Sequence, residues 1–320
     1  MRFGARHEWG RLREVVVGIA PADEIVLFHE EPVRGMPPAL AALSEAQAGH
    51  RLIDIDPEWA RRCESQVEAL AALLAREGIT VHRPTRLAGS ERHFLAPKGE
   101  GSQLFVRDPL IAVDDHLVEA APRRLSRQRE RYGLRAVARD AATRQGARWS
   151  AVPLGVPNGV DGPYLEGGDV LLNGGEVYVG MSGCASDLAG ADWLQHLLGE
   201  RARVIAMAMR SHVRHLDDCL ALIRPGLLVY CPDRLIDGLP MALRDWDKVE
   251  VSADEAARLA THLLVLDANR VITHSDNGRV SDELRRRGIE VVALPFDAPI
   301  RLGGGVRAAC LALDRDGAAD

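Results

Sequence analysis

Polar residues that could take part in catalysis gather in three short stretches of the chain. Carboxylates are suited to bind a guanidinium ion, because its planar N–H donors match a pair of carboxylate oxygens. A histidine beside them can transfer protons as a general acid or base. Each stretch alone is a common combination of residues, so only a shared location would make them a site. The three are Arg107-Asp108, Glu166-Gly167-Gly168-Asp169 and His215-Leu216-Asp217-Asp218.

A fourth candidate lies near the end of the chain, where Gly303-Gly304-Gly305 leads into Val306-Arg307-Ala308-Ala309-Cys310. Glycines allow a backbone to approach a ligand closely, and a short apolar strand then presents one side chain rigidly. We expect such a strand here. Ala308 and Cys310 would share one face of it, about 6–7 Å apart.

The sequence favours neither a metal site nor a disulfide framework. His212, His215 and Asp217 have the composition of metal ligands, but residues three apart on a strand point to opposite faces, so we expect no metal there. The five cysteines are an odd number without C-x-x-C spacing, which fits a reducing cytoplasm. We expect small buried side chains at Cys63, Cys184, Cys219 and Cys231.

A repeated module must position these candidates: a hairpin of two strands, an amphipathic helix and a further strand. In the first copy, strands at 104–113 and 117–121 flank the turn Asp114-Asp115, a helical pattern runs to about 145, and a strand follows at 148–152. The second copy has strands at 170–172 and 176–179 around Asn173-Gly174-Gly175, a strong hairpin signal. Its helix and last strand are predicted at 191–198 and 203–207.

Further copies lie at both ends of the chain. One has strands at 263–266 and 271–273, a helix at 281–287 that ends at Gly288, and a strand at 289–294. The first third has a strand at 14–17, a helix capped by Asp56 with Pro57 at its first position, and a strand at 79–81. Residues 216–230 form two apolar runs that are broken at 224–226.

Four or five copies of a unit of about 40–60 residues, without a linker, predict one closed ring over residues 1–320. Equivalent positions of the copies would converge on a central cavity. Residues 25–50 contain several prolines and fit no element, so we expect a long loop or lid over that cavity.

The composition is that of a soluble globular protein, with 47% hydrophobic and 27% charged residues. A formal net charge of −6 gives no support for a nucleic-acid or membrane partner. Neither a membrane span nor a secretory signal is evident, so we expect a cytoplasmic protein, and the residue usage hints at a bacterial genome. We interpret the basic runs at 123–124 and 285–287 as solvated helix faces.

Taken together, the chain resembles the glycine amidinotransferase family, within the superfamily of guanidino-group-modifying enzymes that also holds the arginine deiminases. The resemblance covers nearly the whole chain and implies a five-bladed, pseudo-symmetric α/β propeller of ββαβ-type modules. The Leu-Gly-Gly-Gly and Pro-Asp-Arg segments favour the amidinotransferase branch. The matching segments lie at 105–108, 146–149, 165–169, 190–194, 215–217, 224–226, 232–234 and 302–305.

By this resemblance, position 308 belongs to a nucleophilic cysteine whose thiolate attacks the guanidinium carbon of L-arginine. Ornithine leaves, and an acceptor amine, or water in a hydrolase, resolves the amidino-thioether. His215 is implied as the general acid and base, Glu166 as the carboxylate that orients it, and Asp108 and Asp217 as the groups that hold the guanidinium. No metal or organic cofactor is implied. The other implied substrate contacts are Arg107, Asp169, Gly304 and Gly305.

Two departures from the family pattern leave alternatives open. Residues 166–169 are closer to the deiminase form, so an arginine deiminase-like hydrolase is the second hypothesis beside an L-arginine:amine amidinotransferase. Ala308 removes the nucleophile. It is either an engineered cysteine-to-alanine change that keeps the pocket and holds a substrate unreacted, which the intact polar positions favour, or the mark of a natural arginine-binding pseudoenzyme. The acceptor and the oligomeric state, a homo-oligomer among the options, cannot be deduced from the sequence.

Overall fold

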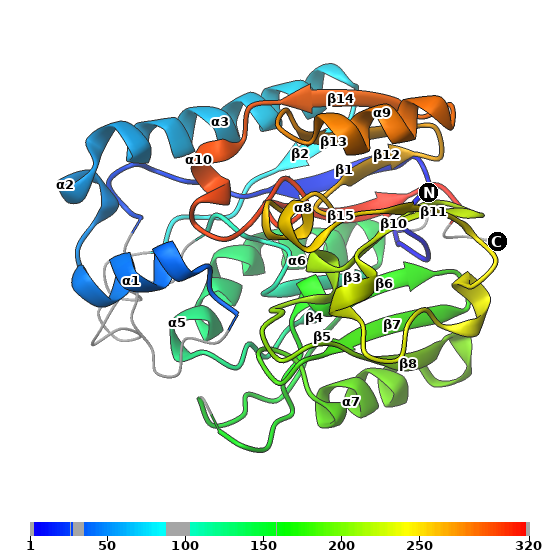
Figure 1. Ribbon diagram of the computed structural model, residues 1–320. Helices are drawn as coiled ribbons and strands as arrows, with labels where there is room; N and C mark the ends of the chain where they lie inside the picture. Colours follow the sequence, from blue (N-terminus) through cyan, green and yellow to red (C-terminus); the bar gives the residue numbers. More distant parts are fainter. Residues whose placement is uncertain (1–2, 26, 28–34, 88–102, 158, 318–320) are drawn as a thin grey trace.

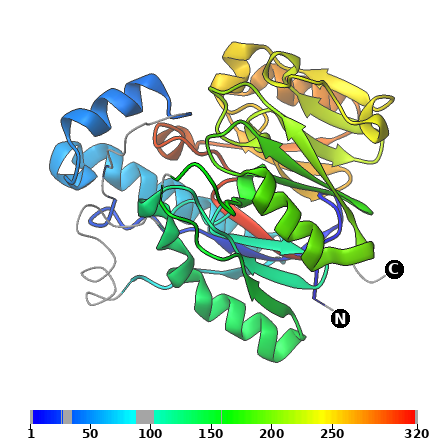
Figure 2. The ribbon, with the colours of Figure 1, turned by 90° about the horizontal axis from the view of Figure 1, so that it is seen from below.

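The computed structural model describes residues 3–25, 27, 35–87, 103–157 and 159–317. Within these ranges the chain forms five three-stranded sheets. In every sheet the central strand is antiparallel to one neighbour and parallel to the other. The sheets surround a common centre, as Figure 2 shows. The predicted ring of repeated α/β modules is therefore confirmed.

The first two sheets follow the predicted order of hairpin, helix and strand (Figure 1). Asp114, with a φ of 51°, forms the first hairpin turn, and Gly174, with a φ of 65°, forms the second. The first sheet contains β3 (Leu110–Val113), β4 (His116–Glu119), α5 (Leu125–Gln128), α6 (Glu130–Gln145) and β5 (Arg148–Ala151). The second contains β6 (Val170–Asn173), β7 (Glu176–Met181), α7 (Leu188–Leu198) and β8 (Arg203–Ala208).

The next two sheets differ in what connects their strands. One consists of β9 (Leu220–Arg224), β10 (Leu227–Tyr230) and β11 (Asp247–Glu250), and short 3-10 turns take the place of a long helix. The short helix α8 (Ala253–Ala257) follows it. The other sheet contains β12 (Leu264–Asp267), β13 (Arg270–His274), α9 (Gly278–Arg286) and β14 (Glu290–Leu294). Gly288, with a φ of 77°, follows α9 as predicted.

The fifth sheet joins the two ends of the chain. It is built from β15 (Cys310–Arg315), β1 (Leu12–Val17) and β2 (Thr80–His82), with α3 (Pro57–Arg76) across its outer face. Asp56 caps α3 as predicted, because its side chain accepts a hydrogen bond of 2.9 Å from the backbone N–H of Trp59. Pairing of β15 with β1 closes the ring.

Three expectations about local structure were wrong. The first strand begins at Leu110, not at 104, and the last begins at Cys310, so Ala308 lies in a turn before the strand. The two segments instead bond to each other across modules, from the backbone N–H of Arg107 to the carbonyl of Ala308 at 3.2 Å. Residues 25–50 contain the helix α1 (Pro38–Ala46), because a proline at the first helical position starts a helix instead of excluding one. Residues 26 and 28–34 lie outside the described part.

One expectation about the surface was also wrong: residues 123–124 are not a solvated helix face, because they precede α5, and Arg123 is partly buried, donates to the carbonyl of Gly159 and lies over the Tyr164 ring.

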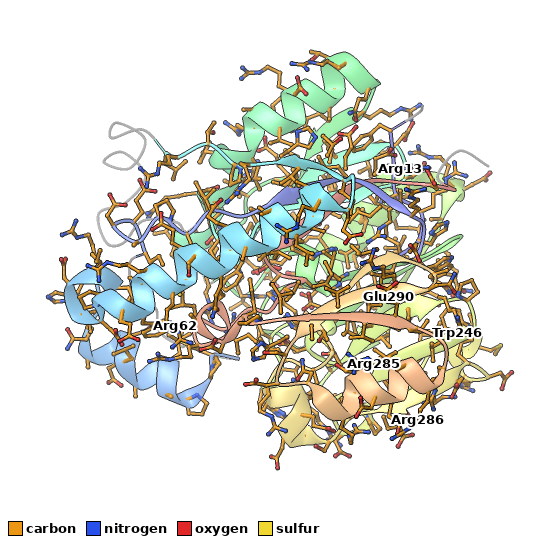
Figure 3. All side chains as sticks on the ribbon, turned by 90° about the horizontal axis from the view of Figure 1, so that it is seen from above. Arg13, Arg62, Trp246, Arg285, Arg286 and Glu290 are labelled. Atoms are coloured by element: carbon orange, nitrogen blue, oxygen red, sulfur yellow. The ribbon has the colours of Figure 1, made fainter. Side chains whose placement is uncertain are left out.

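Other expectations about packing and surface hold. All five cysteines are buried and unpaired. The basic run at 285–287 lies at the solvated end of α9, where Figure 3 labels Arg285 and Arg286. Arg285 pairs with Asp282, and Arg287 with Asp247 and Glu283. In the described ranges, no helix combines the length and the apolar character needed to cross a membrane. Two further short helices, α2 (Leu52–Ile55) and α10 (Asp297–Ile300), lie beside α3.

Candidate active site

Each sheet is preceded by a short polar segment, and we call these five segments the head segments. Each lies directly before the strand of its sheet that pairs antiparallel with the central strand. They are residues 105–109, 166–169, 215–219, 261–263 and 303–309.

Hydrogen bonds join the five head segments into a closed circuit around the centre of the ring. Each segment bonds to the next, and the last returns to the first, so the four sequence candidates are all brought together. The links are Gly167 N to Asp108 O (3.1 Å), Leu216 N to Asp169 Oδ1 (3.0 Å), Thr261 Oγ1 to Asp217 O (2.6 Å), Gly305 N to His262 Nδ1 (3.2 Å) and Arg107 N to Ala308 O (3.2 Å).

His215 lies between two carboxylates in the buried part of this circuit. Its Nε2 is 3.0 Å from Glu166 Oε2, and its Nδ1 is 3.9 Å from Asp108 Oδ1. Burial alone would lower the pKa of His215, but Asp108 and the bond to Glu166 outweigh this and raise it to about 10. The imidazole is therefore protonated at neutral pH and can donate a proton to a leaving group.

Arg127, which the sequence analysis did not select, supplies the opposite charge for these carboxylates. It donates to Asp108 Oδ2 at 2.7 Å, to Glu166 Oε2 at 3.4 Å and to Glu130 Oε2 at 2.8 Å. Burial would raise the pKa of Asp108, but the charges of His215 and Arg127 hold it at about 2. Its position in a short helix, α5, offered no pattern that could have revealed it.

Asp217 faces a different arginine. Its Oδ2 accepts a hydrogen bond of 3.0 Å from Arg307, which also donates to Glu8 at 3.2 Å. The second oxygen, Oδ1, is buried and has no hydrogen-bond partner among the described residues. An unpaired buried carboxylate oxygen is costly, and a bound cation with N–H donors would satisfy it.

Two other predicted residues bond mainly to the backbone. Arg107 donates from Nε to the carbonyl of Cys310 at 3.0 Å, and Asp169 accepts from the N–H groups of Leu216 and Ser186. Burial lowers the pKa of Arg107 to about 10 and raises that of Asp169 to about 7. These contacts hold neighbouring head segments together.

His262 is a site residue that the sequence analysis missed. It is buried, and its Nε2 lies 2.7 Å from Asp218 Oδ1 and 3.5 Å from Asp217 Oδ1. The repeat could have revealed it, because His262 stands two residues before β12, as Asp108 stands two before β3 and Ala308 two before β15. A lone histidine between Thr261 and Leu263 carried no other signal.

The glycines and Ala308 are close-packed. A Cβ at Gly304 would lie 2.4 Å from the Phe105 ring, and one at Gly305 would lie 2.6 Å from His262 Cβ. Ala308 is 6% exposed. Cys310 is fully buried, and burial raises the pKa of its thiol to about 12, so it is not available as a thiolate.

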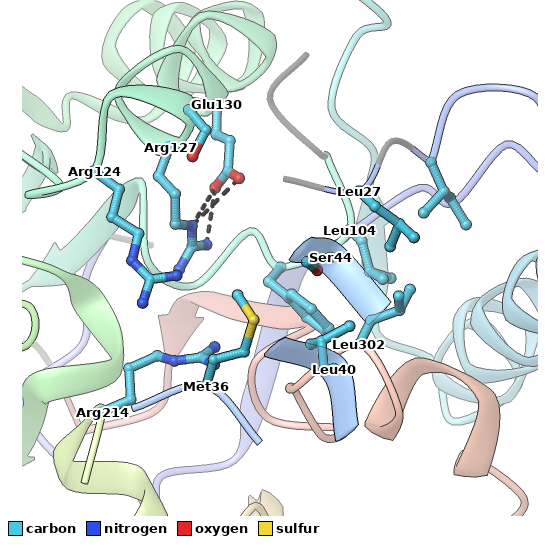
Figure 4. A pocket seen from close by; sticks show the side chains of 13 residues that line it. Leu27, Met36, Leu40, Ser44, Leu104, Arg124, Arg127, Glu130, Arg214 and Leu302 are labelled. Atoms are coloured by element: carbon cyan, nitrogen blue, oxygen red, sulfur yellow. Dashed lines mark hydrogen bonds and ion pairs between the residues drawn. The ribbon is translucent and has the colours of Figure 1, made fainter. Parts of the chain in front are cut away.

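A pocket opens beside Arg127 and Arg214, the residue before His215 (Figure 4). Arginines lie on one side of it and leucines on the other. Ile25, Leu27, Met36, Leu40 and Ser44 also line it, so the described part of residues 25–50 forms part of the wall of this pocket.

Two groups in the described part of the chain lie close enough to share a metal ion: Asp108, Glu166 and His215, and Asp217, Asp218 and His262. In both, an arginine already supplies the compensating charge. His212 is exposed and belongs to neither, and residues 212–215 are not a strand, so the geometric reason given for excluding a metal there was wrong.

The five sheets form a pseudo-symmetric α/β propeller, and the polar head segments converge at its centre. A protein of Streptomyces griseus, provisionally named inosamine-phosphate amidinotransferase 2, is 28% identical over 98% of this chain and 97% of its own length. The structure of inosamine-phosphate amidinotransferase StrB1 from the same organism has a TM-score of 0.79 at 21% identity, covering 98% and 97% of the two chains. Over nearly its whole length, the chain is thus similar to proteins named as amidinotransferases.

A third similarity concerns a cysteine-to-alanine mutant. The structure of such a mutant of AgrE, in a binary complex with L-arginine, has a TM-score of 0.70 at 18% identity, covering 96% of this chain and 41% of that one. No family model matches the chain.

Proposed function

We propose that the protein is built to transfer an amidino group from L-arginine to an acceptor amine, and that Ala308 prevents this transfer in the present chain. The observation that carries the proposal is the buried His215 held between Asp108 and Glu166, in the same circuit as position 308 and the unpaired oxygen of Asp217. Such a site suits a planar cation that is attacked at carbon.

The chemistry requires a thiolate at position 308. Its sulfur would attack the guanidinium carbon and form a C–S bond, while the bond from that carbon to the ornithine nitrogen breaks. The protonated His215 gives its proton to the departing nitrogen, so ornithine leaves as an amine. The acceptor amine then attacks the same carbon, the C–S bond breaks, and the imidazole of His215 takes up the proton that the acceptor loses.

The remaining residues would bind and orient the donor. Asp217 offers Oδ1 to a guanidinium N–H, and Asp108 presents its carboxylate beside His215. Glu166 keeps the ring of His215 in place through the 3.0 Å bond. We assign Arg107 and Asp169 to holding the head segments, since their bonds go to the backbone.

Ala308 leaves this site without a nucleophile. Loss of such a group costs many powers of ten in rate while binding contacts remain. The complex of L-arginine with the cysteine-to-alanine mutant of AgrE supports our interpretation that an alanine at this position holds the donor unreacted.

The acceptor would enter through the pocket that Arg124, Arg127 and Arg214 line. Guanidinium groups at a pocket wall favour a ligand with a phosphate or carboxylate. The name of the Streptomyces relatives refers to a phosphorylated amine, which supports an acceptor of this kind.

The Ala308→Cys variant tests the proposal. Incubated with L-arginine alone, it should form an amidino adduct detectable by mass spectrometry, and it should release ornithine continuously only when an acceptor amine is added. Citrulline and ammonia instead would identify the hydrolase alternative. If neither product forms but arginine still binds by calorimetry, the protein is a non-catalytic arginine-binding protein.

His215 is tested in the same Ala308→Cys background. We expect His215→Ala to lower the rate of ornithine release by at least about 10²-fold, because a positioned general acid contributes at least this much to the departure of a nitrogen leaving group. The exposed His212→Ala is the matched control and should retain full activity. Retention of most activity by His215→Ala would contradict the role assigned to His215.

A further inference from the structure

His262 and Asp218 connect two parts of the proposed site that lie far apart in the chain order. His262 Nδ1 accepts a hydrogen bond of 3.2 Å from the backbone N–H of Gly305. His262 Nε2 lies 2.7 Å from Asp218 Oδ1, and Asp218 Oδ2 accepts 3.2 Å from the backbone N–H of His215. The bridge therefore runs from the glycine turn before Ala308 to the backbone of His215.

The direction of each hydrogen bond follows from the donors. The N–H of Gly305 can only donate, so Nδ1 of His262 must carry a lone pair, and the proton of the neutral ring sits on Nε2. His262 Nε2 donates this proton to Asp218. The same nitrogen lies 3.5 Å from the unpaired Oδ1 of Asp217. A neutral His262 thus satisfies both of its neighbours in one tautomer.

Close packing leaves this bridge little freedom. A Cβ at Gly305 would come within 2.6 Å of His262 Cβ, so the histidine lies directly against the glycine turn. His262 is 4% exposed and the side chain of Asp218 is 14% exposed, so little water competes for these bonds. A shift of the ring would therefore move the turn that carries position 308, the orientation of Asp217, or both.

We propose that His262, acting through Asp218, is a positioning residue that sets the distance between the nucleophile position 308 and the acid/base His215. The inference rests on the proposed amidino transfer. It assigns His262 no contact with the reacting atoms: the residue acts through Gly305 on one side and through Asp218 on the other.

Three variants in the Ala308→Cys background separate the two halves of the bridge. In His262→Asn the side-chain oxygen can replace Nδ1 as the acceptor for Gly305, whereas in His262→Gln the amide can replace Nε2 as the donor to Asp218. His262→Phe keeps the volume and loses both bonds. We expect His262→Phe to lower kcat about 10²-fold with little change in KM for arginine, because misplacement of a reacting group by about 1 Å costs this much. His262→Asn and His262→Gln should each recover part of the kcat that His262→Phe loses.

His274 provides the matched control within the same sheet. It is also buried, its Nδ1 accepts 3.0 Å from the backbone N–H of Phe296, and its Nε2 lies 3.2 Å from Asp276. His274→Phe breaks the same kinds of bond away from the head segments, so it should leave kcat unchanged. A loss of kcat in His274→Phe equal to that in His262→Phe would mean that general destabilisation explains both, and would overturn the proposal.

A second measurement needs no activity. In the unchanged Ala308 chain, hydrogen exchange of the Gly305 amide should accelerate at least about tenfold in His262→Phe and His262→Gln, and stay near the parent rate in His262→Asn and His274→Phe. Unchanged exchange in His262→Phe would refute the bridge. If the Ala308→Cys chain transfers no amidino group, the proposed function fails, and this exchange pattern still decides whether the bridge exists; the positioning role would fall with the function.

Discussion

Buried carboxylates at and beside the head segments share two arginines, and this sharing affects their pKa values. Arg127 pairs with Asp108 and Glu130, and Arg307 pairs with Asp217 and Glu8. Burial nevertheless raises the pKa of Glu130 to about 7, since its arginine is shared with two other carboxylates. Between these groups His215 stays protonated. The same charges that would bind a guanidinium thus prepare the proton that its leaving group needs.

The protonation of His215 makes stability depend on pH. Its pKa of about 10 in the folded state lies above the ordinary value of 6.5, so its contribution is fully present below pH 6.5 and is lost as the pH rises through about 10. Between about pH 7 and pH 10, the melting temperature should fall at least about 5 °C further in the parent chain than in His215→Asn. Thermal melts of the exposed His212→Asn should follow the parent, and equal slopes in parent and His215→Asn would contradict the assignment.

At the scale of elements, the modules approach each other through glycines placed where two head segments meet. Gly167 begins the 3-10 turn before β6, and a Cβ there would lie 2.0 Å from the backbone carbonyl of Arg107. A carbonyl within the packed circuit cannot move away as a flexible side chain would. The short polar segments therefore set how closely neighbouring sheets pack.

Gly167→Ala should destabilise the fold by about 3 kcal/mol, because the methyl group forces two modules apart. Chemical denaturation measures this as a shift of the midpoint at constant slope. Gly175→Ala is the control: it lies in the hairpin turn before β7, where an added Cβ would meet no described atom within 4 Å, and it should change stability by less than about 0.5 kcal/mol. A cost for Gly167→Ala as small as that for Gly175→Ala would refute the close approach.

At the scale of the whole molecule, the ring depends on its last strand. β15 lies between β1 and the neighbouring first module, and its fully buried Cys310 packs in the core that α3 covers. The ends of the described chain meet there, since the N–H of Arg315 donates to the carbonyl of Gly4 at 3.0 Å. We therefore expect the fold to depend on the pairing of β15 with β1, which closes the ring, and less on the order in which the modules follow one another in the sequence.

This closure predicts different outcomes for deletion and for circular permutation. Removing residues 310–317 should abolish cooperative unfolding, because β1 loses its antiparallel partner and the core is exposed. A permutant that joins residue 320 to residue 1 and opens between the exposed Asp237 and Gly238 should unfold in one transition, as expected if residues 1–320 form one domain. Differential scanning calorimetry of the deletion variant and of the permutant measures these outcomes. Two or more independent unfolding transitions in the permutant would contradict a single domain.

Local sequence signals accounted for most of the elements. Turn residues such as Asn173 and Gly174, the cap at Asp56 and apolar periodicity were enough to locate hairpins and helices, because these depend on neighbours in the chain. Position 104 was wrongly assigned to a strand, since an apolar run before β3 has strand character whether or not it finds a partner. The sequence analysis missed Arg127 and His262 because their roles depend on contacts with residues far away in the sequence.

The sequence by itself therefore determined the repeated α/β module, the family resemblance and the polar groups at the head of three sheets. It also led to the prediction that Ala308 occupies the position of the family's nucleophile. Only the tertiary structure decided which groups meet: that Arg127 lies on Asp108, that Asp217 keeps one oxygen unpaired among the described residues, and that His262 joins Gly305 to Asp218. The physical reason is that hydrogen bonds between modules act over a few ångströms, and only closure of the ring brings residues 107 and 308 into that range.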